Sequence, residues 1–131
     1  MREFIKEIKV TEEFIDEQNH VNNLVYIRWM IDIATEHSRA CGCTDLIETQ
    51  GKTWVIREHN IRYLASAILD DVIIIRTFPE SFGKFKSRRC YEMIRKSDSK
   101  KLVSAWTDWV LVDIHKHRPC LITEDIIKTF A

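Results

Sequence analysis

An acidic residue, Asp16, stands immediately before a polar loop that leads directly into a segment of helical character. The stretch from Asp16 to Tyr26 reads DEQNHVNNLVY. A carboxylate can attack a carbonyl carbon, or deprotonate a water that does so. Free backbone N–H groups at a helix start, together with the helix dipole, can stabilise the resulting oxyanion. Thioester hydrolysis needs both features, and the loop after Asp16 can bring them around one carbonyl.

The same residues also allow a purely structural interpretation. Asp16 or Asn19 can cap the helix, which is the commonest role of such residues just before a helix. His20 can be a solvated loop histidine. Tyr26 falls on the apolar side of the helix and can belong to the core. Residue types and spacing alone leave both interpretations open.

Two elements must position this loop. The segment from Phe4 to Asp16 is predicted to be extended, because mostly apolar residues of one parity alternate with polar ones. If that phase persists, Asp16 points inward with Phe14, and its carboxylate must be hydrogen-bonded or functional. The segment from Asn22 to Cys41 is predicted to be a helix buried on most sides, because its charged residues occupy one narrow face. Gly42 is a natural stop for this helix.

Four more strands are expected after a loop, separated by turn-forming residues. Their approximate ranges are Thr53–Leu64, Asp71–Phe78, Lys84–Lys96 and Lys101–Asp113. Near the end of the chain, Thr123 predicts a short capped helical turn. One strand, one nearly enclosed helix and a meander of antiparallel strands indicate an α+β fold, in which a sheet curls around a central helix.

The composition indicates a single cytosolic domain spanning residues 1–131. The 20 Lys and Arg residues balance the 20 Asp and Glu residues, which argues against nucleic acid as the main partner. No apolar run approaches the ~18 residues of a membrane span, so no membrane association is expected. The N-terminus lacks the continuous apolar stretch of a signal peptide. The four cysteines are too scattered for a zinc site and are expected to be free thiols.

The segment from Asp16 to Tyr26 closely resembles the D-x-x-x-H-V-N-N-x-x-Y signature of the hotdog-fold acyl thioesterases. This superfamily includes the 4-hydroxybenzoyl-CoA thioesterase-like enzymes and the acyl-carrier-protein (ACP) thioesterases. Further similarity follows in the same order along the chain, at Trp54–Arg57, Ile61–Leu64, Asp70–Asp71 and Thr107–Asp113. The resemblance covers nearly the whole chain. It implies one hotdog domain, an antiparallel sheet wrapped around a long central helix, which hydrolyses an acyl-CoA or acyl-ACP thioester.

Carried over by position, Asp16 matches the catalytic carboxylate of the superfamily, which acts as a general base or as a nucleophile. Asn23 falls where a backbone N–H forms the oxyanion hole, and His20 matches the histidine that positions or polarises the substrate. Gln18 stands where the ACP branch usually has asparagine, and Asn19 where a glycine often precedes the histidine. These two departures are mild, because Gln18 keeps the amide and Asn19 tolerates left-handed dihedral angles.

A second catalytic patch of the ACP branch has a glutamate followed by a cysteine. Here Glu58 matches the glutamate and His59 replaces the cysteine. Two carboxylates near one thioester would suit one as base and the other as acid. The charge alternation along this strand equally favours a solvated pair of Arg57 and Glu58. With His59, the signature residues Gln18, Asn19 and Tyr26 are candidates for substrate binding.

Lys84, Lys86 and Arg88 share one face of a predicted strand and are further candidates for substrate binding. They suit the phosphates of CoA or the acidic surface of a carrier protein. The solvated outer face of an antiparallel sheet would carry the same residues.

The resemblance implies no metal and no organic cofactor, with water as the second substrate. It also implies a homodimer or homotetramer, because hotdog proteins build their sites between subunits, and the strand Thr53–Leu64 can then pair with its copy. Two alternatives remain. One is a hotdog dehydratase or hydratase, against which the acidic loop before the helix argues. The other is a non-catalytic module that binds an acyl thioester and would not depend on the charge of Asp16.

Overall fold

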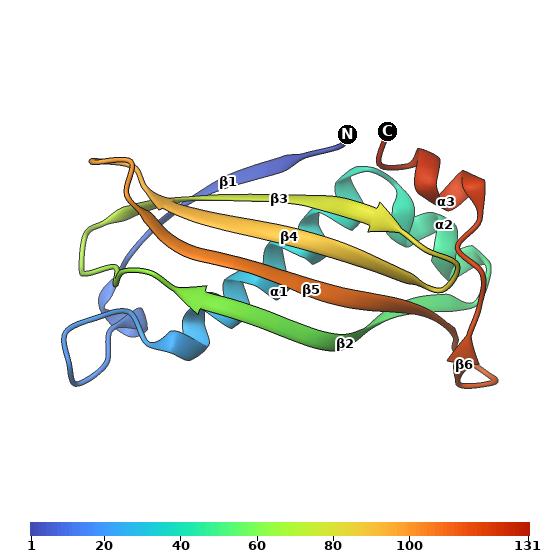
Figure 1. The fold of residues 1–131 in the computed structure, drawn as a ribbon, viewed down its shortest axis with the longest axis horizontal. Coiled ribbons are helices and arrows are strands. Elements are labelled where there is room, and N and C mark those ends of the chain that lie inside the picture. Colours follow the sequence, from blue (N-terminus) through green and yellow to red (C-terminus); the bar gives the residue numbers. More distant parts are fainter.

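The computed structural model describes residues 1–131 and has a curled antiparallel sheet with one long helix against its inner face (Figure 1). The strands are β1 (Phe4–Lys9), β2 (Lys52–Tyr63), β3 (Val72–Phe82), β4 (Lys86–Arg95), β5 (Lys101–Asp113) and β6 (Arg118–Pro119). They lie in the order β1-β3-β4-β5-β2, and β6 pairs with β5. The helices are α1 (Asn23–Ala40), α2 (Cys43–Thr49) and α3 (Glu124–Lys128), with a 3₁₀ turn at Glu12–Phe14. The α+β architecture predicted from the sequence is confirmed.

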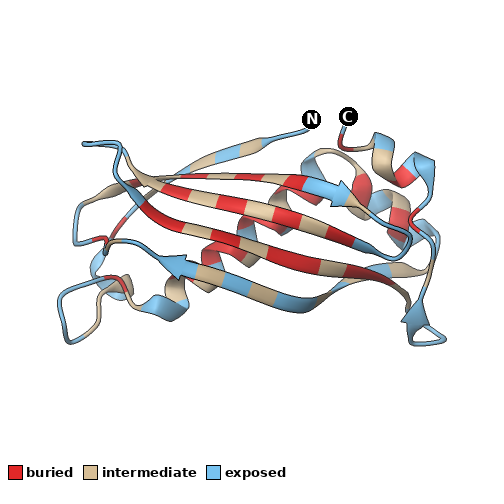
Figure 2. Cartoon of the chain, in the orientation of Figure 1, coloured by how far each residue is buried: buried red, intermediate tan, exposed pale blue.

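Helix α1 packs on the inner face of the sheet because its apolar residues recur at helical spacing on one side. Tyr26 and Met30 are fully buried there, in one cluster with Ile75 and Met93 of the strands. Burial alternates along β3 and β4, so that every second side chain faces α1 (Figure 2). The helix is less enclosed than predicted, since the sheet covers only one side of it and Leu24 is 71% exposed.

Residues 43–49, predicted to be a loop, form α2 instead. Gly42 ends α1 as predicted, and its φ of 86° lets the chain turn directly into α2. Cys43 and Ile47 are buried with Ile126 of α3 in a second apolar cluster at one end of the sheet. A helix of 7 residues is too short to display a periodic pattern, so tertiary packing stabilises it and the sequence alone does not reveal it.

The first strand is shorter than predicted, since β1 ends at Lys9. The N–H of Val10 still donates to the carbonyl of Asp71 at 2.8 Å, which extends the pairing with β3 by one residue before the chain turns away. The 3₁₀ turn at Glu12–Phe14 follows, and Phe14 still packs edge-on against Trp29 of α1, with ring centroids 5.3 Å apart. A loop and a turn therefore set the orientation of Asp16, and the strand phase invoked from the sequence does not reach it.

Strand β2 forms one edge of the sheet and contains a bulge between Ile56 and Glu58, opposite Trp109 and Asp108 of β5. The bulge inserts Arg57 as an extra residue, so Arg57 and Glu58 are both exposed. Beyond it the alternation resumes one residue later. Both side chains therefore face solvent, in agreement with the structural alternative for Arg57 and Glu58.

Several smaller predictions concern the remainder of the chain. Thr123 is the N-cap of α3, as predicted, although its hydroxyl donates to the carboxylate of Asp125 and accepts no backbone N–H of the helix. All four cysteines are free thiols. None of the helices combines the length and the apolar character needed to cross a bilayer.

The start of α1 offers a direct test of the local structure. Asn22 is the N-cap, and its side-chain oxygen accepts the N–H of Leu24 at 2.9 Å. We expect Asn22→Ala to lower the free energy of unfolding by about 1 kcal/mol, because one N–H of the first turn loses its acceptor. Urea unfolding monitored by circular dichroism would measure the loss. The control is Asn23→Ala, whose side chain is exposed and makes no hydrogen bond; an equal loss in both variants would contradict the assignment of the cap.

Candidate functional site

The polar loop from Asp16 to His20 is closed by its own backbone. The N–H of Asp16 donates to the carbonyl of His20 at 3.0 Å, and the N–H of Asn19 donates to the carbonyl of Asp16 at 3.0 Å. Asn19 adopts a φ of 63°, which asparagine tolerates better than most residues. An antiparallel bridge between Ile15 and Val21 fixes the base of the loop. The loop thus has a defined shape that holds Asp16 beside the start of α1.

The carboxylate of Asp16 is half-buried, and only one of its two oxygens accepts a hydrogen bond within the chain. Its Oδ1 accepts the backbone N–H of Gln18 at 2.9 Å. Its Oδ2 has no hydrogen-bond partner, and no Lys or Arg forms an ion pair with it. One oxygen holds the loop, therefore, while the other is available to a substrate or a water.

The first turn of α1 leaves one amide free. The N–H of Leu24 donates to the side chain of Asn22, and the N–H of Val25 donates to the carbonyl of Asn22 at 2.9 Å. The N–H of Asn23 has no partner. Neither Asp16 nor Asn19 caps the helix, which was the structural alternative. A free donor at a helix N-terminus is suited to stabilise a developing oxyanion.

The segment between β2 and β3 holds the loop in place. The carbonyl of Ala67 accepts the N–H of Val21 at 2.9 Å, and the N–H of Ala67 donates to the hydroxyl of Tyr26 at 3.0 Å. Arg95 anchors this segment in turn, donating to the carbonyl of Ser66 at 2.8 Å and to the carboxylate of Asp71 at 3.0 Å. We refer to this arrangement as the Ala67 clamp.

The other residues of the signature separate into two groups. Tyr26 is 1% exposed and lies between the rings of Trp29 and Tyr63, and burial raises the pKa of its hydroxyl. Tyr26 therefore supports the Ala67 clamp from within the core. Gln18, Asn19 and His20 are exposed, and their side chains make no hydrogen bond within the chain. They are accessible to a ligand that approaches the loop.

The second predicted patch, on β2, does not join the loop within one chain. Glu58 is exposed beside the bulge, opposite Asp108 of β5, and its side chain makes no ion pair or hydrogen bond. His59 faces inward, its Nδ1 lies 2.8 Å from the hydroxyl of Thr107, and burial lowers the pKa of its ring. The end of β2 is closer to the loop, since the Tyr63 hydroxyl donates to the carbonyl of Asn23 at 3.4 Å.

The predicted basic patch has a counter-ion that the sequence did not reveal. Asp108 of β5 is 2% exposed, and its carboxylate accepts from Arg88 at 2.8 and 3.1 Å and lies 3.3 Å from the Nζ of Lys86. These partners hold the pKa of Asp108 below its usual range, with the Arg88 hydrogen bond as the largest cause. The Arg88 guanidinium also stacks 3.6 Å from the ring centre of Trp106. Lys84 is exposed and remains the most available cation of the three.

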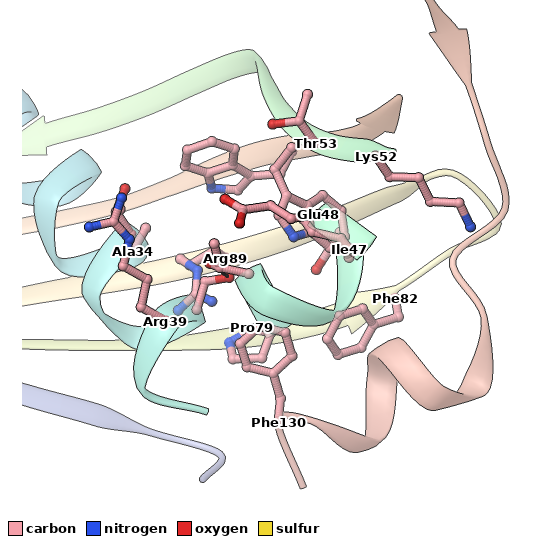
Figure 3. A pocket seen from close by; sticks show the side chains of 16 residues that line it. Ala34, Arg39, Ile47, Glu48, Lys52, Thr53, Pro79, Phe82, Arg89 and Phe130 are labelled. Atoms are coloured by element: carbon pink, nitrogen blue, oxygen red, sulfur yellow. Dashed lines mark hydrogen bonds between the residues drawn. The ribbon is translucent and has the colours of Figure 1, made fainter. Parts of the chain in front are cut away.

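At the opposite end of the sheet from the loop lies a pocket of ≈ 250 Å³ (Figures 1 and 3). It is partly open to solvent and is lined by the second half of α1, by α2, by the starts of β2 and β4, by the end of β3, and by single residues of β5 and the C-terminal segment. Two of the four tryptophans, Trp54 and Trp109, line it, as does Arg89. Arg89 follows Arg88 directly in the chain, but strand parity turns it inward, away from Arg88. That parity was the signal available in the sequence.

This architecture, a curled antiparallel sheet against one long helix, is the hotdog fold, which the solved relatives below share. The family of acyl-ACP thioesterase N-terminal domains matches residues 2–130, and the chain belongs to that family. Comparison of the sequence with curated proteins finds no match.

Solved structures agree with the fold at low sequence identity. A probable thioesterase from Escherichia coli, YbaW, superposes with a TM-score of 0.89 and 16% identity, covering 95% of this chain and 94% of that one. A Staphylococcus aureus protein solved in complex with CoA has a TM-score of 0.89 and 19% identity, covering 98% and 81%. The 12:0-ACP thioesterase of Umbellularia californica has a TM-score of 0.88 and 14% identity. The match covers 98% of this chain and 51% of the plant enzyme, so this chain spans about half of that protein's length.

The buried histidines predict how stability depends on pH. His37 is fully buried; burial lowers the pKa of its ring, and the nearby Arg89 guanidinium adds to that effect against the opposing hydrogen bond to the Met1 carbonyl. The pKa of His59 is lowered by burial as well. Each histidine therefore binds a proton more readily in the unfolded chain. The stability that depends on the neutral rings is present above the unfolded-state pKa of about 6.5 and is lost as the pH falls below it.

We expect the free energy of unfolding to decrease between about pH 7.5 and about pH 5.5, and to decrease less in His37→Gln, whose side chain cannot be protonated there. Urea titrations at both pH values would measure the difference between the two proteins. His115→Gln, at an exposed position, is the control and should keep the full pH dependence. An unchanged pH dependence in His37→Gln would count against the buried neutral ring.

Proposed function

We propose that this chain hydrolyses an acyl-CoA or acyl-ACP thioester to a free acid and a thiol, with Asp16 at the chemical centre. The observation that carries the proposal is the pairing of two unsatisfied groups at one helix start. These are Oδ2 of Asp16 and the backbone N–H of Asn23. Membership of an acyl-ACP thioesterase family and the fold of the solved relatives support the same activity.

In this proposal the thioester carbonyl lies over the first turn of α1, and its oxygen accepts the N–H of Asn23. Acting as a base, Asp16 takes a proton from a water whose oxygen bonds to the carbonyl carbon. The C–S bond then breaks, and the thiolate leaves with the proton. Acting as a nucleophile, Asp16 bonds to the carbon itself and expels the thiolate, which takes up a proton, and water then cleaves the resulting mixed anhydride to the free acid and the Asp16 carboxylate. His20, Gln18 and Asn19 are exposed around the loop and are the side chains proposed to contact the substrate near the thioester.

Glu58 and His59 are proposed to contribute from β2 in an assembled oligomer. β2 is 12 residues long and its outer edge has no partner strand. Exposed backbone N–H and C=O groups on such an edge favour pairing with another strand. Antiparallel pairing of two copies of β2 would set the end of one strand, at Tyr63, beside the start of the other, at Lys52. The loop of one subunit would then lie near the pocket end of its partner.

The thiol-bearing group is proposed to be recognised by the positive residues of β4 and the turn before it. Lys84 is the strongest candidate, because Lys86 and Arg88 already share the carboxylate of Asp108. CoA phosphates or an acidic carrier-protein surface would both satisfy a lysine at this position.

The first test is release of free thiol from a panel of acyl-CoA and acyl-ACP substrates. We expect Asp16→Asn to reduce the rate by about 100-fold or more, because the amide keeps an acceptor for the Gln18 N–H but cannot act as base or nucleophile. Glu17→Gln removes the same charge at the exposed neighbouring position and should retain activity. Equal rates in wild type and Asp16→Asn would move the chemistry to Glu58 and His59. Binding of thioesters without hydrolysis by the wild type would favour a non-catalytic module.

A second test concerns assembly. Sedimentation velocity should give a mass of at least twice the 15.6 kDa of one chain, because pairing removes the open edge of β2. A monomer at micromolar concentration would contradict the proposed pairing. The proposed hydrolysis by Asp16 would then have to proceed with the groups of a single chain.

A further inference from the structure

Arg89 is a buried cation without a counter-ion. Its side chain lies on the inner face of β4 and is 6% exposed. No Asp or Glu carboxylate lies within ion-pairing distance of it, whereas Arg76, Arg88 and Arg95 all have acidic partners. A buried charge that is not paired strongly destabilises the folded state. A guanidinium kept in this position therefore calls for an explanation.

The groups bonded to Arg89 are all neutral. Its Nη1 donates to Nδ1 of His37 at 2.9 Å and to the hydroxyl of Thr77 at 3.2 Å. Because Nδ1 accepts, Nε2 of His37 carries the hydrogen, and it donates to the carbonyl of Met1 at 2.8 Å. The hydroxyl of Thr77 donates in turn to the carbonyl of Cys90 at 2.9 Å. This network and the ring of Phe130, whose centre lies 5.5 Å from the guanidinium carbon, orient the guanidinium but place no negative charge beside it.

The remaining N–H groups of Arg89 face the pocket. Guanidinium has five N–H donors, and only Nη1 is bonded within the protein. No fully occluded side-chain nitrogen or oxygen in the chain lacks a partner, so these free donors are not sealed in the core. Arg89 lines the pocket of ≈ 250 Å³, where Figure 3 shows it between the residues of α1 and Pro79. The guanidinium N–H groups that have no partner in the protein are thus accessible from the cavity.

The rest of the pocket wall combines positive charge with aromatic surface. Arg39 and Lys52 line it together with Arg89, and Glu48 is the one carboxylate. None of these other three charged residues is engaged in an ion pair. The aromatic lining residues are Trp54, Phe82, Trp109 and Phe130. Such a wall suits a ligand with an anionic head and an apolar body.

We propose that this pocket binds an organic carboxylate, whose carboxylate group pairs with the free fork of Arg89 and whose apolar body packs against the aromatic wall. The planar guanidinium matches a carboxylate with two parallel hydrogen bonds. One buried positive charge balances one carboxylate, whereas a phosphate monoester carries about −1.5 to −2 charges at neutral pH. Within one chain the site lies at the other end of the sheet from Asp16, and it does not rest on the proposed hydrolysis.

The probes for the test are 3-phenylpropionate and its uncharged amide, 3-phenylpropanamide, which share one apolar body. Isothermal titration calorimetry and the shift in unfolding temperature would measure their binding to the full chain. We expect the carboxylate to bind and to raise the unfolding temperature, and the amide to bind about 10-fold or more weakly, because a charge-assisted hydrogen-bonded pair is lost. Equal binding of the two probes would overturn the proposal, as would stabilisation by inorganic phosphate alone to the same extent.

Substitutions would test whether Arg89 is the residue that favours the carboxylate over the amide. Arg89→Gln should weaken binding of the carboxylate by about 10-fold or more and bring it close to that of the amide. Arg28→Gln removes the same charge from the exposed face of α1 and should bind as the wild type does. Asp16→Asn should also bind normally, because Asp16 does not line this pocket within one chain. The comparison of the two probes on the wild type stands even if Arg89→Gln does not fold. Unchanged carboxylate binding by folded Arg89→Gln would overturn the assignment.

Discussion

The burial of one side of α1 against the curled sheet is the interaction on which the rest of the structure depends. Tyr26 and Met30 are each removed from water there, a transfer of roughly 1.5–3 kcal/mol for a large side chain. Because α1 runs along the inner face, its two ends lie at opposite ends of the sheet (Figure 1). The N-terminal end meets the Asp16 loop, and the C-terminal half walls the pocket that contains Arg89. One packed helix thus sets the positions of both candidate sites.

The two ends of the helix are organised by different physical means. At the N-terminal end, backbone hydrogen bonds and the Ala67 clamp shape the loop, and its charged group remains accessible. At the other end, side chains surround a charge, and His37 and Thr77 orient it without neutralising it. The unbonded N–H of Asn23 and the free oxygen of Asp16 are suited to chemistry at a carbonyl group. The buried guanidinium of Arg89 is suited to binding an anion.

The sequence predicted the elements whose patterns are long. The strands after residue 50 and the helix from Asn22 to Cys41 agree with the structure to within a few residues, because alternation and helical spacing persist over many positions. The local placement of Asp16 before the start of α1 was likewise readable from the chain. The shortest elements and the contacts between distant strands could not be predicted from the sequence. The 3₁₀ turn at Glu12–Phe14 and helix α2 are too short to carry a period, and the ion pairs of Asp108 join strands whose register no sequence pattern specifies.

The bulge in β2 divides that strand into two segments, each paired with β5 in its own register. Residues 52–56 and 58–63 each keep a strict correspondence with β5, and Arg57 belongs to neither. The side chain at position 57 is exposed within the chain and takes no part in the pairing with β5, so a substitution there leaves the register with β5 unchanged on either side. The bulge therefore gives the open edge of the sheet a point of mutational tolerance next to Glu58, where charge or bulk can change while the fold does not.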